Sequence, residues 1–92
     1  MSTLTDPVVE AARAEIAALD ARLLAIVNQR IRKVAELRRY KEANEIAFVD
    51  PDREAWLVDY LERINRGPLS ELGLRQLMNF LLTLVKREVA SG

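Results

Sequence analysis

The chain has 92 residues, enough for one domain, so a functional site must lie in a single core or at a subunit interface. Its 14 basic residues balance its 14 acidic residues, and this zero net charge gives no indication of a nucleic-acid or membrane partner. The chain contains neither cysteine nor histidine, which excludes disulfides, thiol nucleophiles and the commonest metal ligand and general base. We therefore expect neither a metal nor another cofactor.

No segment has the composition of a targeting or membrane-spanning sequence. Residues 1–6 lack the basic stretch followed by an apolar stretch that marks a signal peptide. No apolar run approaches the roughly 18 residues that a membrane helix needs. Strand patterns, repeats and low-complexity segments are not visible either. The expectation is one cytoplasmic, all-helical domain over residues 1–92.

The first predicted helix is unusually long. It begins at Asp6-Pro7, with Asp6 as N-cap, and nothing interrupts it over 7–44. At 1.5 Å per residue it would be roughly 55 Å long, whereas a compact domain of this size has a radius of gyration of about 12 Å. One subunit cannot cover the apolar stripe of such a helix, so we predict a homodimer in which two copies pack together. The stripe consists of Ile16, Leu19, Leu23, Ile26, Val27, Val34 and Leu37.

A second helix is predicted over 51–65. Asp50 is its N-cap, Pro51 occupies its first position, and Gly67-Pro68 follows its end as a stop signal. Apolar side chains recur at the spacing of a buried face, and two aromatic residues lie on a neighbouring strip, where we interpret them as packing residues. The inward positions are Val58, Leu61 and Ile64, and the aromatic residues are Trp56 and Tyr60.

Ser70 is the expected cap of a third helix over 71–89, in which Gly73 lowers the helix propensity of the first turn. Its apolar residues again follow helical spacing and predict one buried face. They are Leu74, Leu77, Met78, Leu81, Leu82, Val85 and Val89. The predicted fold class is therefore all-α, with one long and two shorter helices.

Three charged residues fall on apolar faces. At 100° per residue, Arg30 lies within about 20° of the leucines of the long stripe, and Lys41 is about 20° from Arg30. Glu54 precedes Val58 by four residues and so shares its face. Burying an unpaired charge costs several kcal/mol, so these cations must meet either protein carboxylates or an anionic ligand.

Periodicity alone leaves other interpretations open. Arg30, Lys41 and Glu54 could form an internal ion-pair network, or their long stems could carry the charges out to solvent. Residues 30–41 hold six cations and could form a nucleic-acid-binding face. Arg32, Lys33 and Arg39 are more simply explained as the solvated side of an amphipathic helix. The residue pattern thus predicts a charged interior but does not by itself name a ligand.

The order and spacing of these residues resemble a known family. The pattern is Arg13-x-x-Ile16-x-x-Leu19-Asp20-x-x-Leu23-Leu24, then Arg30, then Tyr40-Lys41, then Asp50-Pro51-Asp52-Arg53-Glu54. It resembles the all-helical, AroQ-type chorismate mutases over about residues 12 to 89, with matching spacings through the first two helices. The resemblance implies an intertwined dimer with two active sites, each built from both chains. The implied reaction is the rearrangement of chorismate to prephenate.

The resemblance also implies roles for individual residues. Arg30 and Arg53 of one subunit would bind substrate carboxylates, together with Arg13 of the other subunit, and the planar fork of arginine suits a carboxylate. A second set of contacts would act on the reacting part of the substrate. Lys41 would donate to the ether oxygen and to a carboxylate, and Glu54 with Asp50 would hold the ring hydroxyl. Arg30 and Lys41 are therefore the predicted catalytic residues.

The third helix departs from the family pattern. In the family, one position of this helix usually carries Ser or Thr, and a later position carries Gln, which is a second donor to the ether oxygen. Counted from Ser70, these two positions are occupied by Val85 and Val89 in this chain. A register shifted by one residue would put Glu88 at the Gln position, where it could donate only when protonated. Arg38 stands where a glycine is common. We therefore expect weak activity of the isolated chain. A resemblance to the short actinobacterial-type mutases implies activation by docking onto a partner, a 3-deoxy-heptulosonate-phosphate synthase.

Related functions on the same fold remain alternatives. These are a 4-amino-4-deoxychorismate mutase and an isochorismate pyruvate-lyase, and an amine would also pair with Glu54. The hydroxyl-binding pair Asp50 and Glu54 favours chorismate. One alternative of another class is a non-catalytic regulatory or assembly module that retains the anion pocket, and the missing donors of the third helix favour it. Another is a structural helical dimer with internal ion pairs.

Overall fold

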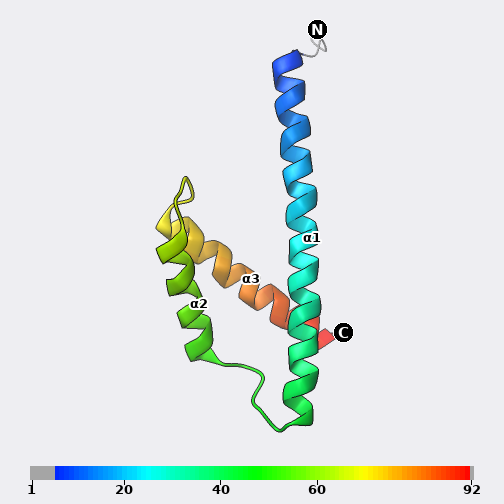
Figure 1. Cartoon of the computed structure of the whole chain (residues 1–92), viewed down its shortest axis with the longest axis vertical. Coiled ribbons are helices and arrows are strands. Elements are labelled where there is room, and N and C mark those ends of the chain that lie inside the picture. The colour runs from blue at the N-terminus through cyan, green and yellow to red at the C-terminus, as the bar shows by residue number, and fades with distance from the viewer. Residues whose placement is uncertain (1–5, 92) are drawn as a thin grey trace. The chain divides into compact units, whose positions relative to one another are not determined.

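The computed structural model describes residues 6–91, which form three helices: α1 (Pro7–Ala43), α2 (Pro51–Ile64) and α3 (Glu71–Ser91) (Figure 1). No strand occurs within this range, so the predicted all-α fold class is confirmed, and each helix end lies within two residues of its predicted position. Over the same range, no helix is both long and apolar enough to cross a membrane. Two compact units divide the chain between Arg30 and Ile31, inside α1.

The first unit contains the part of α1 that ends at Arg30. Asp6 caps this helix as predicted, because its Oδ1 accepts hydrogen bonds from the backbone N–H groups of Val8 (2.8 Å) and Val9 (3.3 Å). No residue of α1 is buried. Leu19 and Leu23, in the middle of the predicted stripe, are 56% and 60% exposed. The single chain therefore leaves this apolar stripe uncovered.

The second unit has its own small core between α2 and α3. Val58 of α2 packs with Leu74 and Met78 of α3, and partly buried leucines surround them. Two predicted inward residues, Ile64 and Leu77, are about half exposed. The prediction was wrong for them because α2 and α3 cover only the strips that face each other. Leu77 lies about 100° around the helix from Met78, and Ile64 ends α2.

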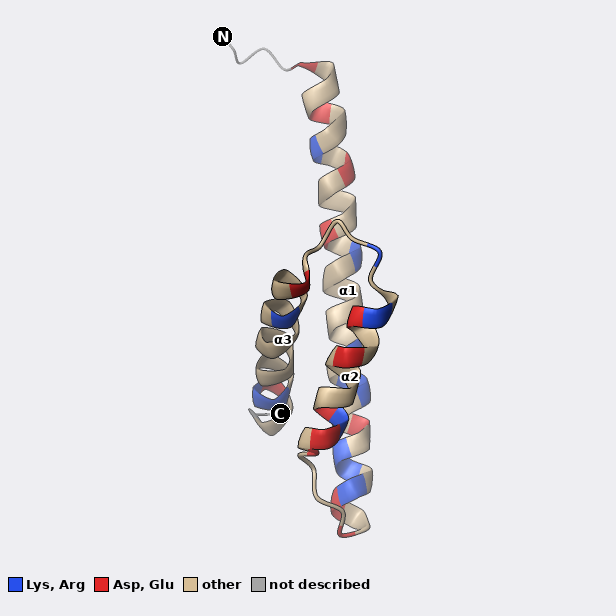
Figure 2. Ribbon diagram, turned by 90° about the vertical axis from the view of Figure 1, so that its left-hand side faces the viewer, with Lys and Arg blue, Asp and Glu red and all other residues tan. Residues whose placement is uncertain are grey.

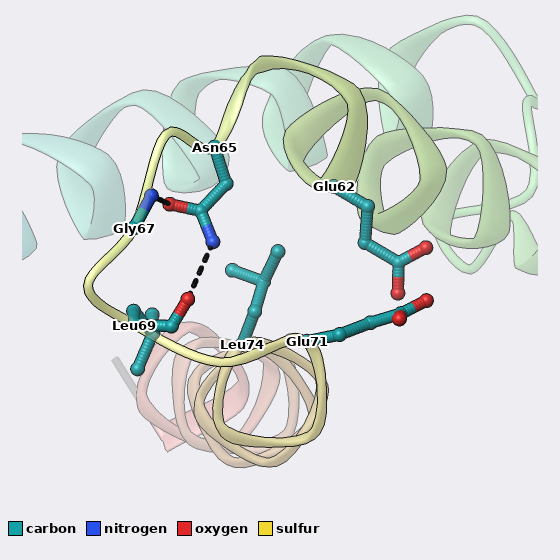
Figure 3. A pocket seen from close by; sticks show the side chains of 6 residues that line it. All are labelled: Glu62, Asn65, Gly67, Leu69, Glu71 and Leu74. Atoms are coloured by element: carbon teal, nitrogen blue, oxygen red, sulfur yellow. Dashed lines mark hydrogen bonds between the residues drawn. The ribbon is translucent and has the colours of Figure 1, made fainter.

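A hydrogen-bonded turn joins α2 to α3. The side chain of Asn65 donates to the carbonyl of Leu69 (2.8 Å) and accepts from the N–H of Gly67 (3.0 Å) (Figure 3). Gly67 has a φ of 77°, a conformation that other residues rarely adopt. Ser70 caps α3 as predicted by accepting from the N–H of Gly73 (3.0 Å). A Cβ on Gly73 would lie 2.9 Å from Leu69 Cδ1, so a larger residue in this first turn would require the Leu69 side chain to move.

The C-terminus of α1 closes with a Schellman motif. The N–H of Ile46 donates to the carbonyl of Lys41 (2.8 Å), and the N–H of Glu45 donates to that of Glu42 (3.4 Å). Glu45 adopts the left-handed conformation, with a φ of 57°, that glycine usually occupies in this motif. The motif turns the chain sharply, so that the connection beginning at Asn44 leads back toward the N-cap of α2.

Candidate active site

The first turn of α2 carries three of the predicted site residues. Asp50 has an extended backbone and accepts a hydrogen bond from the N–H of Arg53 (3.1 Å), so the cap itself fixes the start of the helix. The guanidinium of Arg53 lies 3.9 Å from the centre of the Trp56 ring, and Trp56 stacks on Tyr60 at 5.2 Å. The two aromatic residues therefore pack on each other and support Arg53, rather than filling the core.

Lys41 lies in the last turn of α1 and is partly buried. Its ammonium donates to the backbone carbonyl of Phe48 at 3.3 Å, in the connection that ends at Asp50. An ammonium has three protons, so this contact leaves two for a ligand. The connection thus holds a cation with spare donors close in sequence to the cap of α2.

Arg38 joins three segments of the second unit, a role that the sequence analysis missed. Its Nη1 donates to the carbonyl of Val89 in the last turn of α3 (2.9 Å), and its Nε contacts a carboxylate oxygen of Glu42 (2.8 Å). The guanidinium also lies 5.5 Å from the centre of the Phe48 ring. The sequence could have indicated this role, because Arg38 lies four residues after Val34 and three before Lys41, on one partly buried strip of the helix.

Lys86 of α3 is a second residue that the sequence analysis missed. Its Nζ lies 3.0 Å from Oε2 of Glu54, and both side chains are partly buried. Its sequence position could have revealed this, because Lys86 follows Leu82 by four residues and precedes Val89 by three and so lies beside both on the helix. The predicted inward carboxylate of α2 therefore has a cationic partner from α3.

The buried face of α3 presents valines where the family pattern has donors. Val85 is 1% and Val89 is 7% exposed. The side chain of Glu88 is 51% exposed and lies near Arg87, at 3.9 Å between charged atoms. These positions favour the register in which Val85 and Val89 face inward over the register in which Glu88 does. A hydrogen-bond donor from these two inward positions is therefore missing.

Arg13 and Arg30 belong to the first unit. Arg13 is 72% exposed and pairs with Glu10 one turn earlier (3.2 Å), whereas Arg30 is partly buried. They are 17 residues apart in α1, or about 25 Å along the helix axis, so their guanidinium groups in one copy cannot meet on a small ligand. Of the six predicted site residues, the second unit contains Lys41, Asp50, Arg53 and Glu54.

Basic residues gather along the C-terminal part of α1, whereas acidic and basic residues alternate on α2 (Figure 2). Two hollows in the described part of the chain lie away from the basic stretch of α1. One of about 330 Å³, at the turn between α2 and α3, has Glu62 and Glu71 in its lining and no predicted site residue (Figure 3). Another of about 290 Å³, between α2 and α3, includes Glu54. Neither hollow collects the cations that an anionic ligand needs.

Comparison with known proteins identifies the family. A family model described as chorismate mutase type II matches residues 12–89. The chain belongs to this family. The residues matched are those over which the sequence pattern resembled the all-helical chorismate mutases, so the predicted family is confirmed.

Two curated relatives and one solved structure are similar to this type II family member. The bifunctional chorismate mutase/prephenate dehydratase of Stutzerimonas stutzeri is 32% identical over 80% of this chain, and that of Pseudomonas aeruginosa is 34% identical over 65%. The chain spans 22% and 18% of their lengths. The chorismate mutase (form I) from Thermus thermophilus matches with a TM-score of 0.82 and 26% identity, over 84% of this chain and 96% of that one.

Replacing Arg38 tests its role in holding the end of α3. Arg38→Met keeps the apolar stem but removes the hydrogen bond to Val89, and we expect it to lower the free energy of unfolding by about 1 to 2 kcal/mol. Urea denaturation at one fixed protein concentration measures this. Arg39→Met is the matched control on the exposed side of α1 and should cost less than about 0.5 kcal/mol. Equal losses in the two variants would contradict the assigned role of Arg38.

Proposed function

We propose that the chain is a cytoplasmic isomerase that converts chorismate to prephenate in phenylalanine and tyrosine biosynthesis. Membership of the type II chorismate mutase family supports the reaction. The observation that carries the proposal in this chain is the fixed ammonium of Lys41, bound to the carbonyl of Phe48 two residues before the cap of α2. This contact supports Lys41 as the donor to the reacting oxygen, because Phe48 belongs to the segment that leads to Asp50, Arg53 and Glu54.

The chemistry suits a chain without histidine or cysteine. The rearrangement is unimolecular and pericyclic, so it needs no nucleophile, metal or general base. It needs the substrate held in its compact reactive conformer, and a cation where negative charge develops on the ether oxygen as the C–O bond breaks. Lys41 has two protons left after its contact with Phe48, one for the ether oxygen and one for a carboxylate.

The arginines account for the two substrate carboxylates. The guanidinium carbon of Arg53 lies over the Trp56 ring, and a cation–π contact does not use the N–H groups as hydrogen-bond donors. Those groups can pair side by side with a carboxylate. In the proposal, Arg30 assists from the same subunit and Arg13 of the partner subunit completes the site.

A homodimer is part of this proposal. The exposed stripe of α1, with Leu19 and Leu23 more than half exposed, supports association with a second copy. The separation of about 25 Å between Arg13 and Arg30 along α1 supports a site that takes these residues from different copies. Covering the stripe also removes water from charged residues on the same face, which strengthens their interaction with an anion.

A non-catalytic module that binds the same anion is the second candidate. The buried positions of Val85 and Val89, which lack donors, favour it. Binding of a transition-state analogue without turnover, even in the presence of a partner synthase, would support this function over catalysis.

Lys41→Ala tests the reaction and the site together. Removing a preorganised donor from a developing oxyanion costs about 10² to 10³ in kcat, and we expect a loss of this size in a chorismate-disappearance assay. Lys33→Ala, which removes an exposed lysine paired with Glu36 on the same helix, is the control and should retain wild-type turnover. If Lys41→Ala retains wild-type turnover in an intact dimer, Lys41 is not the catalytic cation.

Mixed dimers test whether each site draws on both copies. Arg13→Ala and Lys41→Ala chains, inactive separately, should recover about a quarter of wild-type activity when unfolded together and refolded, because half the dimers are mixed and each has one intact site. A mixture of Arg30→Ala and Lys41→Ala should recover none, because every site then has one defect. Recovery in both mixtures, or in neither, would argue against the proposed division of residues.

The missing donors of α3 lead to a further expectation about regulation. With Val85 and Val89 in place of donors, we expect low kcat for the isolated chain and at least a tenfold rise, about 1.4 kcal/mol in the barrier, when a 3-deoxy-heptulosonate-phosphate synthase is added. Titrating the synthase into the assay measures the effect, with an unrelated protein of similar charge as the control. High turnover of the isolated chain that the synthase leaves unchanged would rule out this partner.

A further inference from the structure

Glu54 has a close cationic neighbour from another helix. Nζ of Lys86 lies 3.0 Å from Oε2 and 3.2 Å from Oε1 of Glu54, so one ammonium engages both carboxylate oxygens. The side chains are 35% and 30% exposed, and the residues are 32 positions apart in the sequence. The pair is therefore a tertiary contact between α2 and α3, partly shielded from solvent.

Lys86 differs from the other cations of α3. It directly follows Val85, which is 1% exposed, and so lies at the edge of the inward face of the helix. Arg75 pairs with Asp59 and Glu62 more than two turns earlier. Arg87 is 65% exposed. Lys86 thus contacts a residue of the candidate active site, Glu54.

We propose that Lys86 is a specificity-determining residue that, by pairing with Glu54, makes the ring-substituent end of the pocket select a neutral hydroxyl over a protonated amine. The inference rests on the proposed function, in which Glu54 holds the ring hydroxyl of chorismate. The Lys86–Glu54 pair would discriminate between chorismate and 4-amino-4-deoxychorismate, whereas a carboxylate alone would not.

The physical basis is the net charge at that end of the pocket. An unpaired carboxylate attracts an ammonium more strongly than a hydroxyl. Once Lys86 has neutralised Glu54, the carboxylate still has lone pairs that accept from a hydroxyl, because two oxygens offer about four acceptor sites. An ammonium at the same place would add a second cation near Lys86 in a partly buried site and would lose hydration without full compensation. Lys86 thus disfavours the amine while leaving the hydroxyl contact intact.

The test compares two substrates on three proteins. Wild type, Lys86→Gln and Lys86→Arg are assayed with chorismate and with 4-amino-4-deoxychorismate, and both kcat/KM and Kd are measured for each. We expect wild type to prefer chorismate, and Lys86→Gln to shift the amine-to-hydroxyl ratio about tenfold toward the amine. Lys86→Arg keeps the charge and should keep the wild-type ratio.

Arg75→Gln is the matched control, because it removes another contact between α3 and α2, one made with Asp59 and Glu62 rather than with Glu54, and its ratio should equal that of wild type. A general loss of packing would lower both activities and leave the ratio unchanged. An unchanged ratio in Lys86→Gln, with or without lower kcat for both substrates, overturns the inference alone. If wild type binds neither compound, the proposed function and this inference fail together.

Discussion

The uncovered apolar face of α1 is the constraint on which the rest depends. The helix has 37 residues and none of them is buried, while α2 and α3 form a small core with each other. A stripe of leucine and isoleucine that long is costly to leave in water. The cations Arg30 and Lys41 follow the same helical periodicity as the stripe, so a second copy that covers the leucines also takes these charges out of bulk solvent. In the proposed dimer, association and anion binding are therefore linked by one surface.

If the proposed dimer forms, this link explains why the chain can place charges on an apolar face. A desolvated arginine or lysine without a partner costs several kcal/mol, and a bound dianion offsets that cost when it pairs with the cations. The proposed reaction needs fixed charges and a fixed shape, and it needs no group that exchanges protons near neutral pH. A fold with few element types and no histidine or cysteine is sufficient for such chemistry. Because the proposed reaction depends on the positions of the cations and on no other catalytic group, each cation would be hard to replace.

The parts of the fold predicted from sequence were those set by local interactions. The caps Asp6, Asp50 and Ser70 depend on hydrogen bonds to residues two or three positions away, so their roles follow from sequence spacing alone. The contacts that define the candidate site differ in kind. Arg38 with the carbonyl of Val89, and Lys86 with Glu54, join residues far apart in the chain and depend on how α3 is turned and shifted along its axis. Helical periodicity shows which side a residue faces but not which residue lies opposite.

The contact between Lys41 and the carbonyl of Phe48 has a consequence for how such a protein tolerates change. A carbonyl that takes one proton of an ammonium also sets the directions in which the other two point. The length and bend of the connection from Asn44 to Val49 therefore act as an alignment device for a side chain on another element. Under the proposed function, insertions or deletions there would rotate the donors of Lys41 away from the ether oxygen. If Lys41 acts as proposed, changes in this loop would therefore be limited by the angular tolerance at the reacting bond as well as by stability.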